Sequence, residues 1–308
     1  MRVFVTGGTG LVGRRVVARL RDRGDDAIVL SRSLAAAGRM PAGTHFISGD
    51  PAAAGPWLDE LAACDGVIHL AGEPIAGHRW TTAFRRKVLD SRVDSTALIA
   101  AALARSPTRA DGSPRVLVSA SAVGYYGMFE DNPTEFVEAD PPGSGFLADV
   151  CVAWEAAAVP AAGAGVRVAT VRVGMVLAGD GGALPQLAKP FRWYLGGPVG
   201  SGRQWVSWIH VEDVAGLFVL ALDRADVSGP VNGTAPEPVT NWGFSRTVAD
   251  VLHRPCWLRV PKLALRLGLG TMAELATRGQ RVVPMRAKEL GYEFRYPLLE
   301  PALREALH

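Results

Sequence analysis

Cysteine is scarce in this sequence of 308 residues. The three cysteines, Cys64, Cys151 and Cys256, lie far apart, their number is odd, and none belongs to a C-x-x-C pair. A disulfide scaffold needs paired cysteines, whereas isolated ones are typical of a reducing compartment. We therefore expect a cytoplasmic protein without disulfide bonds.

Clusters of metal ligands and long apolar runs are missing as well. The six histidines are scattered without metal-ligand spacing, so we expect no metal site. No uninterrupted apolar run approaches the ~18 residues of a membrane-spanning helix. The first residues, Met1–Val5, run straight into a glycine turn and do not resemble a signal peptide. We therefore expect a chain without a membrane partner.

The net charge of +3 is too small to indicate a nucleic-acid partner. Several arginines near the N-terminus share the spacing of one solvated helix face, which is the favoured interpretation. In the other interpretation, Arg14 or Arg15 contacts a phosphate. The expected partner is a small-molecule substrate, and the chain itself is expected to be a monomer or a homodimer.

The remaining composition is that of a globular protein, with 48% hydrophobic and 20% charged residues. Helical patterns such as Leu11–Arg23 and Thr82–Leu103 alternate with short apolar runs rich in β-branched residues. Such alternation predicts an α/β protein with a Rossmann-type, doubly wound parallel sheet of about seven strands. The six clearest strand candidates are Val3–Thr6, Ala27–Leu30, His45–Ile47, Val67–Leu70, Val116–Ser119 and Val168–Val171.

The sequence changes character near Val173, where glycine, proline and tryptophan become frequent. Loop-rich segments of this kind are typical of a site-forming lobe. A helical pattern at Val211–Leu222 and an apolar run near Gly229–Asn232 indicate a return to the sheet. The predicted division is therefore a Rossmann domain of 1–175, with a returning segment near 207–235, and a smaller C-terminal substrate lobe of 176–206 and 236–308.

The strongest motif is the glycine loop V-F-V-T-G-G-T-G-L-V-G, which lies between a predicted strand and a predicted helix. In a dinucleotide fingerprint one glycine permits a tight turn, one lets the pyrophosphate approach the backbone, and one lets the helix pack on the sheet. The N–H groups and dipole at the helix start then hold the anion. The alternative is a glycine turn without a ligand. The expected cofactor contacts in this loop are Gly7, Thr9, Gly10, Leu11, Val12 and Gly13.

The end of the second predicted strand indicates which dinucleotide is bound. A carboxylate there would bind the ribose hydroxyls of NAD, but this chain has Arg32 between Ser31 and Ser33. A guanidinium and two hydroxyls suit a 2′-phosphate, so we expect NADP(H), with Ser31 and Arg32 in contact with it. The alternative is that Arg32 is a solvated loop residue.

These motifs and five others, in order and spacing over essentially the whole chain, resemble the atypical extended short-chain dehydrogenase/reductases (SDRs) called epimerase family proteins. The others include V-I-H-L-A-G-E-P-I, S-A-S-A-V-G-Y-Y-G and G-G-P-V-G-S-G-R-Q-W-V-S-W-I-H-V-E-D-V. The resemblance implies a Rossmann domain, a smaller C-terminal substrate lobe and NADP(H) as cofactor. Some members carry a cell-division-inhibitor label, which nothing in these residues supports.

The resemblance also implies individual site residues. His210 and Asp213 match a family pattern in which a buried structural hydrogen bond is the favoured role. Lys87 faces either the site or solvent. Further expected cofactor contacts are Leu70, Ala71, Gly72, Arg92 and Ser119, and expected substrate contacts are Glu73, Arg79 and Trp80.

The usual chemistry of the superfamily is missing. Ordinary members use a serine with a Tyr-x-x-x-Lys pair, in which the lysine lowers the pKa of the tyrosine so that the phenol can exchange a proton. Ser121 matches the serine, but no Tyr, Lys, Arg or His lies between Met128 and Val166. The remaining candidates for catalysis are Ser121, Tyr125 and Tyr126. Downstream, Glu155 is interpreted as a helix cap or salt bridge and Cys151 as core.

The loop of the C-terminal lobe offers Arg203 and Gln204 beside Trp205 and Trp208. Arg, Gln and two indoles suit an anionic or aromatic group, so Arg203 and Gln204 are expected substrate contacts, although structural tryptophans would give the same pattern. The leading hypothesis is an NADP(H)-dependent oxidoreductase or epimerase-like enzyme acting on a small carbonyl or sugar-type substrate. The alternative is a non-catalytic NADP(H)-binding regulatory protein.

Overall fold

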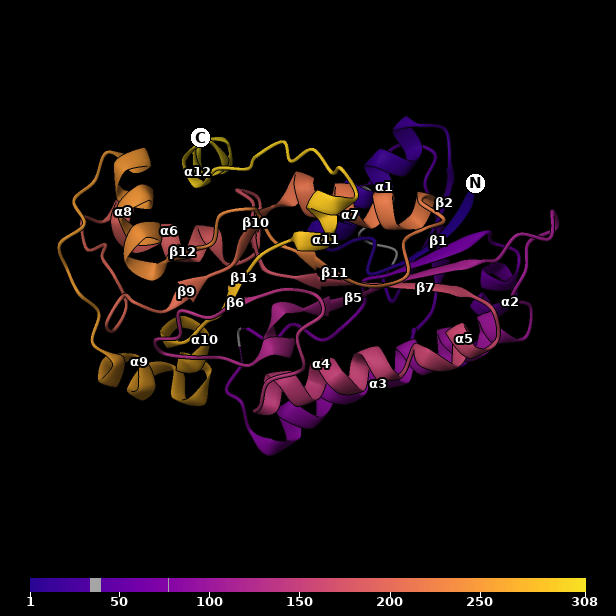
Figure 1. Cartoon of the computed structure of the whole chain (residues 1–308), viewed down its shortest axis with the longest axis horizontal. Coiled ribbons are helices and arrows are strands. Elements are labelled where there is room, and N and C mark those ends of the chain that lie inside the picture. Colours follow the sequence, from indigo (N-terminus) through magenta and orange to yellow (C-terminus); the bar gives the residue numbers. More distant parts are fainter. Residues whose placement is uncertain (34–39, 77) are drawn as a thin grey trace.

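In the computed structural model, which describes residues 1–33, 40–76 and 78–308, a seven-stranded parallel sheet forms the centre of the molecule (Figure 1). The strand order is β11-β7-β5-β4-β1-β2-β3, and every neighbouring pair is parallel. This arrangement confirms the predicted doubly wound α/β sheet. The strands are β1 (Arg2–Thr6), β2 (Asp26–Ser31), β3 (His45–Ser48), β4 (Gly66–His69), β5 (Val116–Ala122), β7 (Arg167–Val173) and β11 (Gly229–Gly233).

Helices cover both faces of this sheet, as Figure 1 shows. On one face, α1 (Leu11–Asp22) packs against α7 (Val211–Asp223). The other face carries α2 (Trp57–Ala62), α3 (Thr82–Ala104), α4 (Phe146–Ala156) and α5 (Val159–Gly163).

The apolar strands follow from this double cover. In β1, Val3 and Val5 belong to the core beneath α1 and α7, whereas Phe4 between them belongs to the core beneath α2 and α3. Successive side chains of a strand point to opposite faces, so a strand covered on both sides must be apolar throughout. The uniform apolar runs in the sequence are explained in this way.

The C-terminal half of the chain adds smaller elements with an apolar cluster of their own, centred on Trp208, Leu177 and Leu303. The division predicted from the sequence stays a prediction. The elements are β8 (Met175–Leu177), α6 (Leu184–Arg192), β9 (Trp205–Val206), β10 (Trp208–His210), β12 (Val239–Thr240), α8 (Asn241–Leu252), α9 (Lys262–Leu269), the 3-10 helix η3 (Gly270–Ala273), α10 (Glu274–Thr277), β13 (Arg281–Val282), α11 (Met285–Glu289) and α12 (Leu299–Leu307). Two short elements, the 3-10 helix η2 (Val123–Tyr126) and β6 (Glu135–Phe136), follow β5.

His210 and Asp213 join this half to the sheet. The buried His210 precedes α7, where its Nδ1 accepts a hydrogen bond from the Glu212 N–H and its Nε2 lies 2.8 Å from a Glu305 carboxylate oxygen. The buried carboxylate of Asp213 accepts the backbone N–H groups of Arg295 at 2.7 Å and Tyr296 at 2.9 Å. Both residues thus make structural hydrogen bonds, which is the role favoured from the sequence.

One stretch, Phe146–Gly163, is apolar and long enough to cross a membrane by length and composition alone. It comprises α4 and α5, both of which contact α3. An apolar stretch that packs in this way against a sheet-covering helix is weak evidence for a membrane span.

We expect Asp213→Asn to lower the free energy of unfolding by about 2 kcal/mol, because the amide nitrogen cannot accept the second buried N–H. Urea unfolding measures the change. Asp226→Asn, the same substitution on an exposed carboxylate, is the control and should change little. Equal effects of the two substitutions would show that the Asp213 hydrogen bonds do not hold the C-terminal segment.

Candidate functional site

The candidate site lies where the strand order reverses. The chain moves from β1 outward to β2 and β3, and then returns to β4 on the other side of β1. In open parallel sheets, ligands bind in the crevice that such a reversal leaves at the carboxyl ends of the strands. The loops after β1 and β4 meet there, since a Cβ on Gly7 would lie 2.7 Å from the Leu70 carbonyl carbon.

The glycine loop has the geometry that a dinucleotide needs. Gly7 has a φ of +68°, and a Cβ on Gly13 would lie 2.2 Å from the Gly7 carbonyl oxygen. Helix α1 therefore approaches the loop more closely than any other residue type permits. Gly10 is the residue before this helix, and no side chain caps the helix start. The first turn of the helix contains no acidic residue. An open helix start of this kind fits a pyrophosphate, and the partly exposed Thr9, Leu11 and Val12 belong to the same turn.

The segment after β2 fits a 2′-phosphate. The buried Ser31 hydroxyl donates to the Ser33 carbonyl oxygen at 2.8 Å and accepts the Ser33 N–H at 3.2 Å, which forms a tight turn. Arg32 lies at the exposed corner of this turn, and within 1–33, 40–76 and 78–308 no carboxylate pairs with it. Its guanidinium is therefore available to an anion.

A buried histidine, which no sequence motif marked as a site residue, holds the loop after β4 in place through hydrogen bonds. His69 Nδ1 lies 2.6 Å from the Thr6 hydroxyl, and its Nε2 lies 3.1 Å from the Ser95 hydroxyl. The Thr6 oxygen in turn accepts the Ala71 N–H at 3.3 Å. Burial, and secondarily the charge of Arg92, lowers the pKa of His69 to about 3, so the ring is neutral at pH 7. The network joins β1, β4 and α3 beneath the expected cofactor contacts.

Glu73 lies farther along the same loop, where it contacts Arg92 and Lys87 of α3. Arg92 donates from Nη1 to the Glu73 carbonyl oxygen at 3.0 Å, and its guanidinium lies 5.0 Å from the centre of the Trp154 ring. Burial lowers the pKa of this arginine. Lys87, whose environment the sequence left open, makes an ion pair of 2.9 Å with the Glu73 carboxylate. Gly72 lies beside Arg92, since a Cβ there would be 3.1 Å from the guanidinium carbon.

Arg79 and Trp80 differ in exposure. Arg79 is exposed, whereas Trp80 is buried and donates its indole N–H to the Ile75 carbonyl oxygen at 2.9 Å. The centre of the Trp80 ring also lies 5.5 Å from the centre of the Phe146 ring at the start of α4, in an edge-to-face arrangement. Trp80 thus holds the loop after β4 against α4, and its contact with substrate stays a prediction.

A buried ion pair organises the end of β5. The Ser121 hydroxyl donates to a Glu155 carboxylate oxygen at 2.7 Å, and Arg172 pairs with both oxygens of Glu155 at 2.9 Å. Burial alone would lower the pKa of Arg172, but its bonds with Glu155 outweigh burial and raise the pKa. Glu155 is therefore the salt-bridging residue expected from the sequence. Ser119 is buried, and its hydroxyl donates to the Ala120 carbonyl oxygen.

The two candidate tyrosines have different environments. Tyr126 is fully buried; its hydroxyl donates to Asn232 at 2.7 Å and accepts from Arg172 at 2.9 Å. Burial raises the pKa of Tyr126 to about 12. Tyr125 is only half-buried, and the Arg172 guanidinium carbon lies 3.4 Å from its ring centre. Tyr126 is therefore bound within the core, whereas the ring of the half-buried Tyr125 lies beneath a cation.

Helix α4 contains neither a tyrosine nor a lysine. The side of α4 that faces η2 carries Leu147 and Cys151, four residues apart, because a Cβ on Gly124 would lie 3.3 Å from Leu147 and 3.8 Å from the Cys151 sulfur. Burial raises the pKa of the Cys151 thiol to about 11, which agrees with its interpretation as core. Neither side chain can act as the tyrosine or lysine of an ordinary member.

Arg203 and Gln204 have protein partners. Arg203 is exposed and pairs with Asp131 at 2.9 Å, whereas Gln204 is buried and donates to the carbonyl oxygens of Val199 and Ala276. The Gln204 amide oxygen is buried, and the described residues offer it no hydrogen-bond partner. Contact of either residue with substrate stays a prediction.

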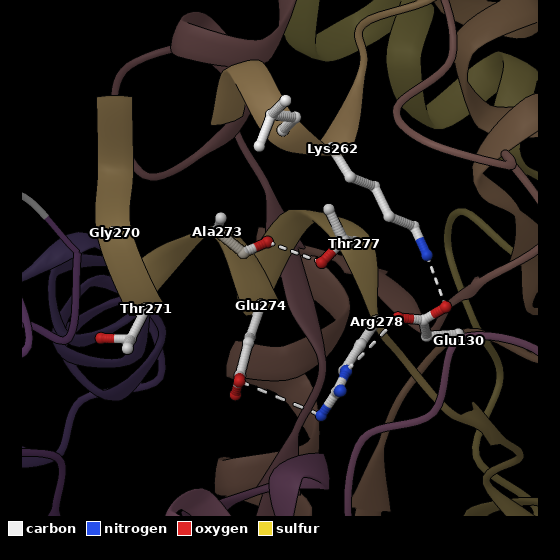
Figure 2. Close-up of a pocket in the computed structure, with 9 residues that line it drawn as sticks. Glu130, Lys262, Gly270, Thr271, Ala273, Glu274, Thr277 and Arg278 are labelled. Carbon is white, nitrogen blue, oxygen red and sulfur yellow. Dashed lines mark hydrogen bonds and ion pairs between the residues drawn. The ribbon is translucent and has the colours of Figure 1, made fainter. Parts of the chain in front are cut away.

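A cavity of about 560 Å³ lies in the C-terminal half, away from this crevice. Figure 2 shows its walls, which come from α9, η3 and α10, with Glu130 between Lys262 and Arg278. None of the site residues expected from the sequence lines it. We take the strand reversal as the candidate site. The glycine loop with its open helix start, the exposed Arg32 and the tyrosines follow strands of the central sheet, whereas none of them lines the cavity. No group of three metal-ligating side chains occurs among the described residues.

Three central residues were missed in the sequence: His69, Arg172 and Asn232. Arg172 and His69 each stand as one polar residue within a buried apolar strand, V-R-V and V-I-H-L, and that contrast was the available signal. Asn232, at the end of β11, gave no comparable signal, because its partners Tyr126 and Val283 are distant in sequence.

Comparison with known proteins agrees with this site. Residues 3–232 match the family model described as the NAD dependent epimerase/dehydratase family, and residues 260–306 match a domain of unknown function, DUF1731. The chloroplastic epimerase family protein SDR39U1 homolog of Arabidopsis thaliana is 42% identical over 99% of this chain and 86% of the relative. The epimerase family protein YfhF of Bacillus subtilis is 36% identical over 100% of this chain and 98% of the relative.

A solved structure of human epimerase family protein SDR39U1 (isoform 2) with NADPH is 34% identical, with a TM-score of 0.84, over 100% of this chain and 99% of that one. A nucleoside-diphosphate sugar epimerase from Corynebacterium glutamicum is 33% identical, with a TM-score of 0.78, over 100% of this chain and 58% of that one.

The His69 network predicts a pH dependence of stability. The pKa of the folded histidine, about 3, lies below its ordinary value of 6.5, so the unfolded chain binds the extra proton first. Stability from this residue is therefore present above pH 6.5 and is lost as the pH falls toward 3, by up to about 1.4 kcal/mol per pH unit. Urea unfolding of wild type and His69→Gln between pH 7 and pH 4.5 measures the difference, and wild type should show the steeper loss. Parallel curves would contradict the buried neutral ring.

Proposed function

Since this chain belongs to the NAD dependent epimerase/dehydratase family, we propose that it is an NADP(H)-dependent oxidoreductase or epimerase-like enzyme of the extended SDR type. Its substrate is a small carbonyl or sugar-type compound. The observation that carries the proposal is the open start of α1 above the Gly7–Gly13 contact, at the carboxyl edge of the sheet where β2 leads into Arg32 and β5 leads into Tyr125. The NADPH in the human relative supports the choice of cofactor.

The residues of three loops hold the cofactor. The glycine loop, with Gly7, Gly10 and Gly13, binds the pyrophosphate through backbone N–H groups, and Arg32 with Ser31 binds the 2′-phosphate. When bound, the nicotinamide supplies or accepts a hydride at a substrate carbon. Thr9, Leu11, Val12, Leu70, Ala71, Gly72, Arg92 and Ser119 are proposed to line the cofactor.

Tyr125 is the proposed proton donor, because the geometry separates it from the other two candidates. The hydroxyl of Tyr126 is occupied on both sides, and that of Ser121 is directed to Glu155. The Arg172 cation over the face of Tyr125 fixes the ring, and the residue is only half-buried. Ser121 and Tyr126 act as positioning residues through Glu155 and Arg172. Glu73, Arg79, Trp80, Arg203 and Gln204 are the proposed substrate contacts.

The alternative function is a non-catalytic NADP(H)-binding regulatory protein. The observation that favours it is the absence of tyrosine and lysine from α4 and from the rest of the segment between Met128 and Val166. Both functions are compatible with a cytoplasmic monomer or homodimer without a nucleic-acid partner, which we propose for this chain.

We expect Arg32→Ala to lower NADPH affinity about 10- to 100-fold, toward that for NADH, because one charge-assisted contact to the 2′-phosphate is lost. Titration of tryptophan fluorescence with each cofactor measures both affinities. Arg105→Ala, which removes an exposed charge at the far end of α3, is the control. Equal affinities of wild type for NADPH and NADH would overturn the role of Arg32 but not the dinucleotide site.

Tyr125→Phe should lower kcat by about 10²- to 10⁴-fold without a change in NADPH affinity, because a positioned proton donor contributes that much. NADPH absorbance, followed over a panel of carbonyl compounds and nucleotide sugars, measures turnover. Tyr126→Phe is the matched variant; it should lower stability by about 1–3 kcal/mol through the unpaired Asn232 and Arg172. Tight NADPH binding by wild type without turnover of any compound favours the regulatory protein. A Tyr125→Phe variant with normal kcat would exclude this residue as the donor.

A further inference from the structure

Large apolar side chains gather on the surface of the C-terminal half. Trp193 is 70% exposed, Tyr194 55%, Leu195 52% and Trp257 67%. Monomeric soluble proteins rarely expose contiguous apolar patches of this kind without a binding role. We call the surface formed by 187–195, 254–259 and α9 the distal face. In Figure 1, the chain segment that joins α8 to α9 runs along the edge of the molecule opposite the N-terminus.

Backbone contacts make the first two segments one surface. The N–H groups of Trp257 and Leu258 both donate to the Gly196 carbonyl oxygen, and the Trp257 indole donates to the Tyr194 carbonyl oxygen at 3.0 Å. A Cβ on Gly197 would lie 2.0 Å from the Leu258 carbonyl oxygen, so the two segments touch. Tyr194 has a φ of +60°, a conformation that a non-glycine residue seldom adopts, while its ring stays exposed.

Helix α9 extends this surface. Leu263 and Leu267, one helical turn apart, are 69% and 74% exposed. A bridge between Val199 and Val260 places the chain that leads into α9 next to the first segment. The exposed leucines and tryptophans therefore lie on adjoining parts of the fold.

The segments that form the distal face carry basic residues and no acidic ones, and Lys262 at the start of α9 pairs with Glu130 from outside them. No aspartate or glutamate occurs in 181–211 or in 251–273. Lys189, Arg192 and Arg259 are exposed and Arg254 lies over the Tyr194 ring, and within the described part of the chain none of the four is within ion-pair distance of a carboxylate. By contrast, many other surface arginines are paired, for example Arg224 with Asp226. Unpaired basic residues in the same segments as exposed aromatic and aliphatic groups favour an anionic partner.

The charge also discriminates between possible occupants. In a symmetric dimer the same patch faces itself, which would set Lys189, Arg192 and Arg259 against their own copies without a carboxylate to neutralise them. Single-stranded nucleic acid would stack on the tryptophans but would not cover the leucines of α9. An anionic lipid surface satisfies both features, since Trp and Leu enter the headgroup and acyl boundary while Lys and Arg meet the lipid phosphates.

We propose that the distal face docks this protein peripherally on an anionic lipid membrane. The proposal replaces the sequence-based expectation of a chain without a membrane partner, and it is independent of the function proposed above. Docking by this face would leave the crevice at the strand reversal, on the sheet, to its cofactor.

Vesicle co-sedimentation of the full chain tests the proposal, with phosphatidylcholine vesicles that contain or lack phosphatidylglycerol. We expect binding only to the anionic vesicles, with a loss as salt rises. Lys189→Glu with Arg192→Glu should lower the partition coefficient more than about tenfold, because each basic residue near such a surface contributes about fivefold. Trp193→Ser with Trp257→Ser should lower it similarly.

Two matched controls keep the test specific. Arg105→Glu with Lys288→Glu makes the same change in net charge on exposed residues elsewhere, and Val159→Ser removes an exposed apolar group from α5. Both should bind as wild type does, and thermal unfolding checks that every variant is folded. The proposal is overturned if wild type binds neither vesicle, if it binds both equally, or if the remote charge reversal is as damaging as the distal one. It is also overturned if the wild-type chain does not bind vesicles but does self-associate or bind RNA, and the tryptophan substitutions abolish that self-association or RNA binding.

Discussion

The contact between Gly13 and the Gly7 carbonyl oxygen is the constraint on which the site depends. Because a Cβ at residue 13 would lie only 2.2 Å from that oxygen, α1 can begin directly above the loop and direct its open N-terminus into the crevice. The same loop touches the loop after β4 at Leu70. A larger side chain at either glycine would separate α1 from the sheet, and the anion site, the turn at residue 71 and the core under Val16 and Val17 would all shift together.

A second constraint, the Arg172–Glu155 pair, organises the other side of the crevice. A buried ion pair is favourable only when hydrogen bonds satisfy its remaining polar atoms. Here Ser121 donates to the carboxylate, and Tyr126 accepts from the guanidinium. The pair therefore binds the end of β5, η2, α4 and β7 into one unit, and in doing so it uses two of the three hydroxyl groups that the sequence offered as catalytic. Tyr125 is the candidate whose hydroxyl this network does not consume.

The sequence predicted the parts of the fold that local patterns encode. The strands, the glycine loop and the helices that follow them depend on runs of adjacent residues, and the double cover of the sheet follows from apolar strands such as Val3–Thr6. The roles of Tyr125 and Tyr126 could not be separated in this way, because they are set by Arg172 and Asn232, 46 and 106 residues downstream of Tyr126. The hydrogen bonds of His69 could not be predicted for the same reason, since both of its partners lie on other elements. Exposure of Trp193 and Trp257 was likewise invisible, because a tryptophan looks the same in sequence whether it is core or surface.

The missing lysine changes what the site must do for proton transfer. In an ordinary member the lysine lowers the pKa of the tyrosine and binds the nicotinamide ribose. Here the cation nearest to a free tyrosine is Arg172, which lies over the face of the Tyr125 ring rather than beside its hydroxyl. Its charge is also paired with Glu155. A buried ion pair whose hydroxyl neighbours are all engaged is a preorganised environment, and that favours a working site over a collapsed remnant.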